Sequence, residues 1–267
     1  MPGGKGANQA VSMARLENPV RFLGKLGRDS FGDKLLKSME ADGVDISRIQ
    51  LVDKVSSGLA VINVDKLGNN NIVVIAGANG LVDPDYLHKN KDSFAWADLV
   101  VLQFEIPMAT VREALKLSRQ FGCKTIVNPA PAYELDQEIL EAIDIIIPNE
   151  HELARISQTE VVDQASLLAA SQILLDRGVK EVIVTLGDKG AFHLNREGQK
   201  LYPAFKVRAL DTTAAGDSFI AGFSSHYGLT GNIEEAIVLG QRVASLTVQK
   251  LGAQASLPRR ADLEAFK

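Results

Sequence analysis

The sequence predicts an α/β protein, with a mostly parallel central sheet, helices on both faces of the sheet and a small β lid. Two observations carry this prediction. From Leu99 onward, short apolar runs alternate with amphipathic stretches, as is typical of a parallel sheet covered by helices. Residues 57–76 instead hold two β-branched runs around a turn, which predicts a hairpin. This hairpin either covers a cleft as a lid or forms the edge of the main sheet.

The individual elements follow from periodicity. The expected strands are short, β-branched and almost wholly apolar, as strands buried on both faces are, and cover residues 98–102, 125–128, 144–147 and 182–185. Apolar residues recur at helical spacing over residues 108–121, 134–142 and 164–177. Two further helices, 214–227 and 233–250, carry small residues on one face, which either lets them pack closely or leaves room for a planar ligand. With no repeat or linker, we expect a single domain over residues 1–267.

Composition limits the classes of function. The 267 residues are 46% hydrophobic and 23% charged, as in an ordinary soluble globular protein. A net charge of −4 argues against nucleic acid or an anionic membrane as a partner. Cys123 is the only cysteine, so neither a disulfide nor a thiolate cluster forms within one chain, and the four histidines lack metal-ligand spacing. No signal peptide or spanning segment is visible, and we expect a cytoplasmic protein.

The most informative motif lies near the C-terminal end, where residues 211–219 form a small-residue turn that opens an amphipathic helix. The backbone N–H groups of Ala214, Ala215 and Gly216 have no partner in a first helical turn, so they favour an anion together with the helix dipole. Asp217 follows them and can accept a proton from a hydroxyl held beside that anion. The pairing suits phosphoryl transfer from a nucleotide to an alcohol. The alternative is an aspartate that only stabilises the helix dipole.

A glycine-rich loop opens the chain at residues 3–10 and runs directly into a helix. Its glycines permit close backbone approach, and Lys5 and Asn8 offer donors suited to hydroxyls or phosphate. The loop does not have Walker A spacing, and no G-x-G-x-x-G motif follows a strand anywhere in the chain. Both absences disfavour a P-loop enzyme and a Rossmann dehydrogenase.

Polar residues follow three of the predicted strands, at the sheet edge where open α/β sheets bind ligands. Glu105 follows the first of these strands. Asn149 and Glu152 lie three apart at a helix start, where they are either partners of a hydrated magnesium ion or a helix cap with an acidic first turn. Residues 185–190 either wrap a nucleotide phosphate or form a simple turn between strands.

Together these motifs resemble the PfkB family of carbohydrate kinases, and among its members those of ribokinase type. Residues 3–10 are similar to the first signature of the family, and residues 211–217 to the second. The intervening motifs also match in order and approximate spacing, at residues 26–32, 77–79, 128–131 and 148–152. The resemblance covers the whole chain and implies a ribokinase-like α/β fold.

The resemblance implies an ATP-dependent phosphotransferase that transfers the γ-phosphoryl group to the primary hydroxyl of D-ribose, giving ribose 5-phosphate. The implied cofactors are Mg²⁺ and an activating K⁺. Deoxyribose, fructose or a nucleoside are alternative acceptors, and a chain that binds nucleotide without catalysis is a further alternative. A homodimer through the lid strands is also implied, with no nucleic-acid or membrane partner.

Roles for single residues also follow from the resemblance. Asp217 becomes the base, and the anion hole is formed by Ala214, Ala215 and Gly216. The sugar hydroxyls are held by Gly4, Lys5, Gly6, Ala7, Asn8 and Glu105. ATP is bound by Asn149, Thr185, Leu186, Gly187, Asp188, Lys189, Gly190, Gly216 and Gln241, with Gln241 near the adenine and Glu152 associated with Mg²⁺. A monovalent cation is bound, largely by carbonyls, at Asp211, Thr213, Thr247, Lys250, Gly252 and Ser256.

Two departures from the family pattern affect these expectations. Ala214 occupies a position where many members have glycine. Family members also usually carry a segment before the glycine-rich loop, which supplies the first core strand, two lid strands and an Asn-x-Asp element for the sugar. Because this sequence begins at that loop, we expect an open sheet edge, a lid reduced to residues 57–76 and an incomplete sugar site.

Overall fold

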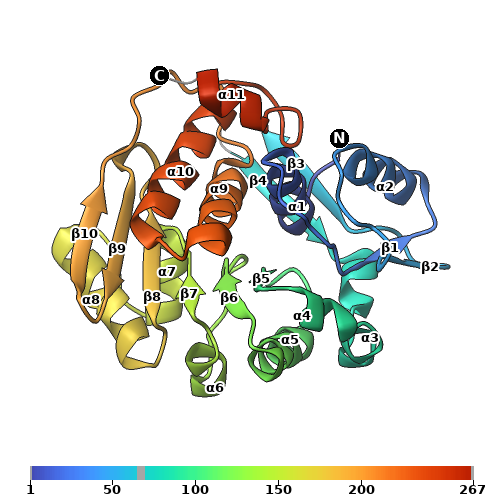
Figure 1. The fold of residues 1–267 in the computed structure, drawn as a ribbon, viewed down its shortest axis with the longest axis horizontal. Coiled ribbons are helices and arrows are strands. Elements are labelled where there is room, and N and C mark those ends of the chain that lie inside the picture. The colour runs from blue at the N-terminus through green and yellow to red at the C-terminus, as the bar shows by residue number, and fades with distance from the viewer. Residues whose placement is uncertain (1, 65–69, 266–267) are drawn as a thin grey trace.

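The computed structural model describes residues 2–64 and 70–265 and contains the predicted mostly parallel sheet (Figure 1). Its six strands lie in the order β10-β9-β8-β7-β6-β5. The four parallel strands are β5 (Leu99–Leu102), β6 (Lys124–Val127), β7 (Ile145–Ile146) and β8 (Glu181–Thr185). An antiparallel pair, β9 (Ala191–Asn195) and β10 (Gly198–Tyr202), extends the sheet beyond β8. At the other end β5 is the edge strand and is only half-buried, as expected for an open edge.

Alternate residues of the strands point to opposite faces, and each face has its own core. Ile126 belongs to the core under two C-terminal helices, α9 (Ala215–Thr230) and α10 (Ile233–Thr247). Its neighbour Val127 belongs to the core under the helices of the other face, which are α5 (Met108–Phe121), α6 (Gln137–Glu141), α7 (Glu150–Ser157) and α8 (Gln164–Asp176). The continuous apolar runs in the sequence therefore reflect strands covered on both faces.

Glycines let α9 and α10 pack closely, as the small-residue pattern predicts. A Cβ added to Gly222 would lie 2.8 Å from Cγ2 of Val243 and 3.0 Å from Cα of Gly240. A Cβ on Gly240 would lie 2.8 Å from the carbonyl oxygen of Phe219. A methyl group at either glycine would force the two helices apart, so their spacing depends on both residues.

The N-terminal part of the chain lies beyond the β5 edge of the sheet (Figure 1). The first helix, α1 (Lys5–Arg15), packs against α9, and a separate parallel pair is formed by β1 (Lys25–Gly27) and β2 (Gln50–Val52). Around this pair lie α2 (Ser30–Ala41), the 3₁₀ helix η1 (Gly77–Leu81), α3 (Pro84–Lys89) and α4 (Asp92–Trp96). The glycine-rich loop predicted over residues 3–10 is shorter than expected, because α1 already begins at Lys5, and it leads into α1 beside the helix that carries Asp217.

The predicted hairpin consists of β3 (Leu59–Val64) and β4 (Asn70–Ile75), which pair in register from Leu59 opposite Ile75 to Val64 opposite Asn70. The pair forms a two-stranded sheet of its own, so the alternative of an edge hairpin of the main sheet is wrong. The predicted turn at residues 66–70 lies outside the described residues except for Asn70. Exposed apolar side chains on the hairpin are Val61, Val73, Val74 and Ile75.

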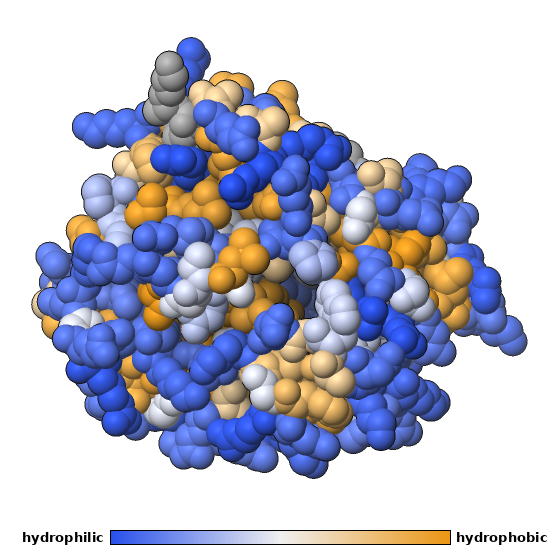
Figure 2. Space-filling view, viewed as in Figure 1, coloured by the Kyte–Doolittle hydropathy of each residue, from blue (hydrophilic) through white to orange (hydrophobic). Residues whose placement is uncertain are grey.

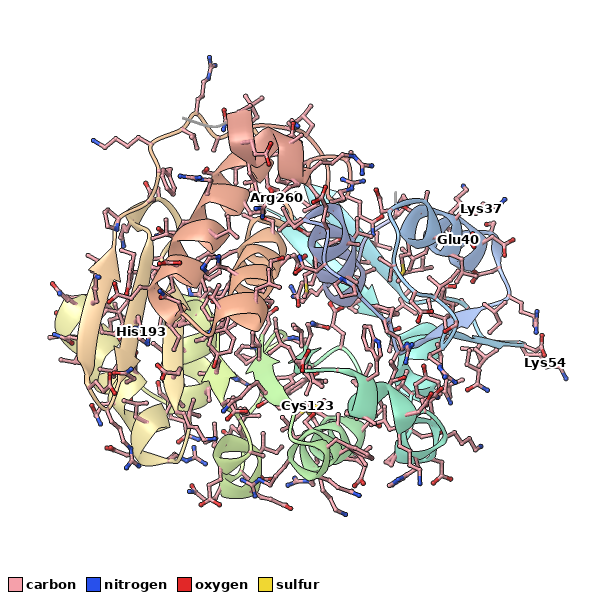
Figure 3. The ribbon with its side chains drawn as sticks, in the orientation of Figure 1. Lys37, Glu40, Lys54, Cys123, His193 and Arg260 are labelled. Atoms are coloured by element: carbon pink, nitrogen blue, oxygen red, sulfur yellow. The ribbon has the colours of Figure 1, made fainter. Side chains whose placement is uncertain are left out.

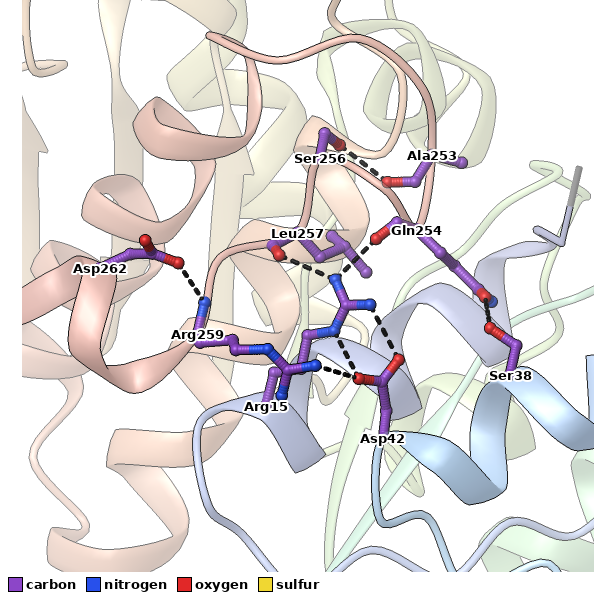
Figure 4. A network of polar contacts seen from close by, with 9 residues as sticks. All are labelled: Arg15, Ser38, Asp42, Ala253, Gln254, Ser256, Leu257, Arg259 and Asp262. Atoms are coloured by element: carbon purple, nitrogen blue, oxygen red, sulfur yellow. Dashed lines mark hydrogen bonds and ion pairs between the residues drawn. The ribbon is translucent and has the colours of Figure 1, made fainter.

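A polar network ties the end of α1 to two distant parts of the chain (Figure 4). Arg15 donates through Nε and Nη2 to the carboxylate of Asp42, at 2.9 and 2.8 Å, and through Nη1 to the carbonyl oxygens of Gln254 and Leu257. Arg259 donates to the same carboxylate at 2.9 Å. The segment that leads into α11 (Arg260–Ala265) is therefore held against α1 and α2.

Some predicted bounds differ from the structure. The helix expected over residues 134–142 is shorter, because the side chain of Asp136 accepts from the N–H of Ile139 and starts α6 at Gln137. The strand expected over residues 144–147 shrinks to two residues, with the Asp144 carboxylate accepting from the N–H of Thr125 at 2.9 Å. No helix among the described residues is long and apolar enough to cross a membrane.

Candidate active site

The carboxyl ends of the parallel strands meet the first residues of α1 and α9 at a cleft of about 230 Å³. Figure 2 shows that this face of the molecule is hollowed near its centre. Predicted site residues from four separate motifs line the cleft, and its full lining is Lys5, Asn128, Ile147, Asn149, Glu152, Thr185, Thr212, Ala214, Ala215, Gly216, Asp217 and Ile220. Of the three strand ends whose polar residues were expected to converge, two line the cleft, through Asn149, Glu152 and Thr185, whereas Glu105 is not part of the lining.

A larger hollow of about 510 Å³ lies beside β2 and α3. Of the cations that line it, Lys25 is paired with Asp83 at 3.3 Å and Arg48 is paired with Asp92. The smaller cleft holds a buried carboxylate and unpaired backbone donors, so we place the chemistry there. Neither Cys123 nor His193, both labelled in Figure 3, is among the residues that line it, and the Cys123 thiol lies beside the carbonyl oxygens of Phe94 and Ala97.

The start of α9 forms a smaller anion hole than the sequence predicts. Ala214 caps the helix with φ of 63°, a left-handed conformation that costs an L-residue energy. The Ala215 N–H donates to the carbonyl oxygen of Thr212 at 3.1 Å, so the expectation that this group is free is wrong. In the part of the chain that the structure describes, the N–H groups of Ala214 and Gly216 have no partner. Two donors therefore remain for an anion.

Asp217 lies at the bottom of the cleft and is only 9% exposed. Its Oδ2 accepts from Nδ2 of Asn8 at 2.8 Å, and its Oδ1 accepts from Nε2 of Gln9 at 3.1 Å. Burial raises the pKa of the Asp217 carboxyl group, while the Asn8 amide, the charge of Lys5 and the Gln9 amide each lower it. A carboxylate that only complemented the helix dipole would not need to be buried between amide donors, so the geometry favours a chemical role.

The predicted sugar-binding residues are only partly brought together. Lys5 lines the cleft, and its charge lowers the pKa of Glu105, which burial raises. Asn8 contacts Asp217 rather than the cleft. Of the remaining three, none lines the cleft: Gly4 is the residue before α1, Gly6 lies against the side chain of Gln103, and Ala7 belongs to a hydrophobic core cluster with Val11 and Met39. Their direct role in binding sugar therefore stays a prediction.

Asn149 and Glu152 form the helix cap that the sequence offered as an alternative to a magnesium site. The N–H of Glu152 donates to the Asn149 side chain at 2.8 Å, and the N–H of Asn149 donates to the Glu152 carboxylate at 2.9 Å. Both residues also line the cleft, so the cap does not exclude contact with a ligand. Burial raises the pKa of Glu152, and the nearby charge of Asp217 raises it further.

The segment from Thr185 to Gly190 is a turn between β8 and β9 that contains the short 3₁₀ helix η2 (Gly187–Lys189). Gly190 has φ of 110°, and a Cβ there would lie 1.9 Å from the carbonyl oxygen of Tyr202, so only glycine fits. Of this segment only Thr185 lines the cleft. Gln241 is buried and donates to the same Tyr202 carbonyl at 2.7 Å, so in this structure its side chain does not line the cleft.

Part of the predicted monovalent-cation set is held together just before α9. The carboxylate of Asp211 accepts from the N–H of Thr213 at 2.9 Å and from the N–H of Gly252 at 2.8 Å. Thr247 and Ser256 turn their hydroxyls to carbonyls of their own segments. Lys250 follows α10 and is exposed. Within the described residues, no group of three or more acidic, histidine or cysteine side chains is placed to hold a metal ion.

Two residues of the catalytic surroundings escape the sequence-based site prediction, Gln9 and Asn128. Gln9 follows the predicted ligand Asn8. Because successive helical residues point about 100° apart, the two side chains were not expected to reach the same site. Asn128 belongs to a motif of the family resemblance without an assigned role. The sequence offered only one signal for either residue, an amide side chain near a predicted strand end or helix start.

A family profile described as pfkB family carbohydrate kinase matches residues 1–260. The chain belongs to the PfkB family of carbohydrate kinases. It is 38% identical over 264 residues to the ribokinase of Haemophilus influenzae, covering 99% of this chain and 86% of that protein. It is 37% identical over 257 residues to the deoxyribokinase of Salmonella typhi, covering 96% of this chain and 84% of that protein.

A bifunctional ribokinase/ribose-5-phosphate isomerase A of Fructilactobacillus sanfranciscensis is 41% identical over 259 residues, which is 97% of this chain and 48% of that protein. The chain thus spans about half the length of this relative. Among solved structures, Arabidopsis thaliana ribokinase complexed with ribose and ATP has a TM-score of 0.94 at 30% identity, covering 98% of this chain and 86% of that one. The predicted ribokinase-like fold is confirmed.

Proposed function

We propose that this PfkB kinase transfers the γ-phosphoryl group of ATP to the primary hydroxyl of D-ribose. The observation that carries the proposal is the buried Asp217 carboxylate beside the unpaired N–H groups of Ala214 and Gly216. A base and an anion hole at one helix start are what transfer of a phosphoryl group to an alcohol requires. The ribokinases among its relatives support ribose as the acceptor.

In the proposed mechanism, Asp217 accepts the proton of the sugar hydroxyl while that oxygen attacks the γ-phosphorus. The bond from the γ-phosphorus to the bridging oxygen of ADP breaks, and ADP leaves with the electron pair. The N–H groups of Ala214 and Gly216 stabilise the charge on the transferred group. Lys5, at the same cleft, adds a positive charge beside the phosphates.

The acidic and amide groups of the cleft fit a magnesium ion. Mg²⁺ usually keeps several waters and binds through one or two carboxylates together with substrate phosphates. Asn149 and Glu152 lie in the cleft with Asp217 and would hold the hydrated ion. When bound, Mg²⁺ neutralises phosphate charge.

Two finer features belong to the same proposal. A potassium ion near Asp211 would act on the anion hole, because Asp211 joins the loop at Gly252 to the turn at Thr213, just before Ala214. The exposed apolar strands of the β3–β4 hairpin support a homodimer through the lid. We also expect the protein to act in the cytoplasm.

The first test compares acceptors. Purified protein with ATP, Mg²⁺ and K⁺ should release ADP in proportion to added ribose, with a higher kcat/KM than for 2-deoxyribose, fructose or adenosine. A higher value for 2-deoxyribose would favour the second candidate, which the deoxyribokinase relative supports. Absence of acceptor-dependent ADP release across this set, with ATP still bound, would refute the kinase proposal and favour a chain that only binds nucleotide.

A further inference from the structure

Two successive residues of α1 each hold one oxygen of the Asp217 carboxylate, but the two amides are not equivalent. Asn8 contacts Oδ2 through Nδ2, and its own Oδ1 is buried without a hydrogen-bond partner among residues 2–64 and 70–265. Gln9 contacts Oδ1 through Nε2 at 3.1 Å, and its side-chain oxygen is also engaged. Of the two, only Gln9 is therefore held by groups other than Asp217.

The ends of two neighbouring strands fix the Gln9 amide. Nε2 of Gln103, just after β5, donates to Oε1 of Gln9 at 2.6 Å. Nε2 of Gln9 lies 3.3 Å from Oδ1 of Asn128, just after β6, and Asn128 donates to the carbonyl oxygen of Ile147 at 3.2 Å. Because Gln103 donates to the Gln9 oxygen, the Gln9 nitrogen must face Asp217. Gln9 is 2% exposed, so water does not compete for these bonds.

We propose that Gln9 is a positioning residue that anchors Oδ1 of Asp217 and thereby leaves Oδ2 as the oxygen that accepts the proton of the substrate hydroxyl. The inference rests on the proposed function and deepens it. Asn8, with one free oxygen and a single side-chain partner, exchanges its contact with Oδ2 when the hydroxyl arrives. Gln9 keeps its contacts throughout, and the carboxylate does not rotate away from the anion hole.

The charge balance around Asp217 agrees with this geometry. Burial raises the pKa of the carboxyl group, and the Gln9 amide is among the groups that lower it. Other charged groups that act on this cleft are Lys5, Glu105 and Glu152. Removing the Gln9 donor takes away one of the groups that lower the pKa of Asp217. The pKa then rises further, and more of the Asp217 carboxyl group is protonated at a given pH.

The test is Gln9→Met, which keeps the volume of the side chain and removes its donors. We expect kcat to fall about 10- to 100-fold, the effect of one hydrogen bond to a charged group, with a smaller change in KM for the sugar. The acid limb of the pH profile should move to higher pH. Gln103→Leu, which frees the Gln9 amide without removing it, should move the limb in the same direction by less.

The matched control is Thr110→Val in α5, away from the cleft, which removes a buried 2.6 Å hydrogen bond from the Thr110 hydroxyl to the carbonyl oxygen of Val82. Its pH profile should equal that of the wild type. Thermal unfolding checks that all variants fold. A Gln9→Met profile with an unmoved acid limb would overturn the inference, even if kcat fell.

A second readout does not depend on activity. The ¹³Cγ resonance of Asp217, assigned by its loss in Asp217→Asn, should titrate at higher pH in Gln9→Met than in the wild type. An unchanged titration refutes the role of Gln9 and leaves the kinase proposal intact. A shifted titration in a protein without sugar-dependent ADP release would refute the kinase proposal and leave the coupling of Gln9 to Asp217 intact.

Discussion

At the scale of single residues, the site depends on a carboxylate that the fold shields from water. Burying a charge is expensive unless it is paired and hydrogen-bonded, and Asp217 receives one amide donor on each oxygen. Ala214 adds a second local cost through its left-handed conformation. Both costs fall at the start of α9, the part of the chain where the proposed function places the chemistry.

The raised pKa of Asp217 predicts how stability changes with pH. A carboxyl group whose pKa is higher in the folded state destabilises the fold once pH rises past its unfolded value. Asp217→Asn should therefore gain stability relative to the wild type as pH rises above about 4, the ordinary pKa of an aspartate, as measured by urea unfolding. Asp45→Asn is the opposite control, because hydrogen bonds from Ser47 and from Arg21 lower the pKa of Asp45 to about 2. If the wild type instead became more stable relative to Asp217→Asn as pH rises, the raised pKa of Asp217 would be contradicted.

At the scale of elements, α9 has two functions on different parts of its length. Its first turn, from Ala214 to Asp217, lines the cleft, and its middle packs on α10 through Gly222. The position of the first turn depends on this packing, because a rigid helix transmits a displacement of its middle to its end.

Two glycines of α9 offer a matched pair of substitutions. Gly222→Ala should lower the free energy of unfolding by about 1–2 kcal/mol, because the methyl group meets Val243 and Gly240. Gly228→Ala should raise it by about 0.5–1 kcal/mol, because alanine is the better helix former and the nearest atom, Cδ2 of Leu99, would be 3.8 Å away. Chemical unfolding measures both, and equal effects of the same sign would contradict the packing described here.

The elements also show how far sequence reasoning reaches. Helix α5 has the predicted bounds, because the apolar spacing over Met108–Phe121 is regular and Gly122 ends it in a left-handed conformation. The placement of the β3–β4 hairpin apart from the main sheet was left open, since pairing between distant strands leaves no periodic signal. The same limit applies to Gln9, whose partners Gln103 and Asp217 are far away in sequence.

At the scale of the whole molecule, the cleft joins parts of the chain that are distant in sequence. Lys5 comes from the start of α1, Thr185 from the end of β8, and Asp217 from α9. The Arg15 network holds α1 in place against α2 and the C-terminal segment, with the Asp42 carboxylate only 7% exposed. The motifs and the sheet edge where they meet could be predicted from the sequence, but the hydrogen bonds that Asn8 and Gln9 make to Asp217 required the fold.

The most direct measurement of the central claim is ribose-dependent ADP release by the wild type and by Asp217→Asn, with ATP, Mg²⁺ and K⁺ present. Removing a general base should lower kcat by about 10²- to 10⁴-fold. ATP binding, followed by thermal shift, should persist, because Asn149 and Thr185, which we propose to contact the nucleotide, are unchanged. Loss of turnover with retained ATP binding is the predicted result. Turnover by Asp217→Asn close to that of the wild type would contradict the account.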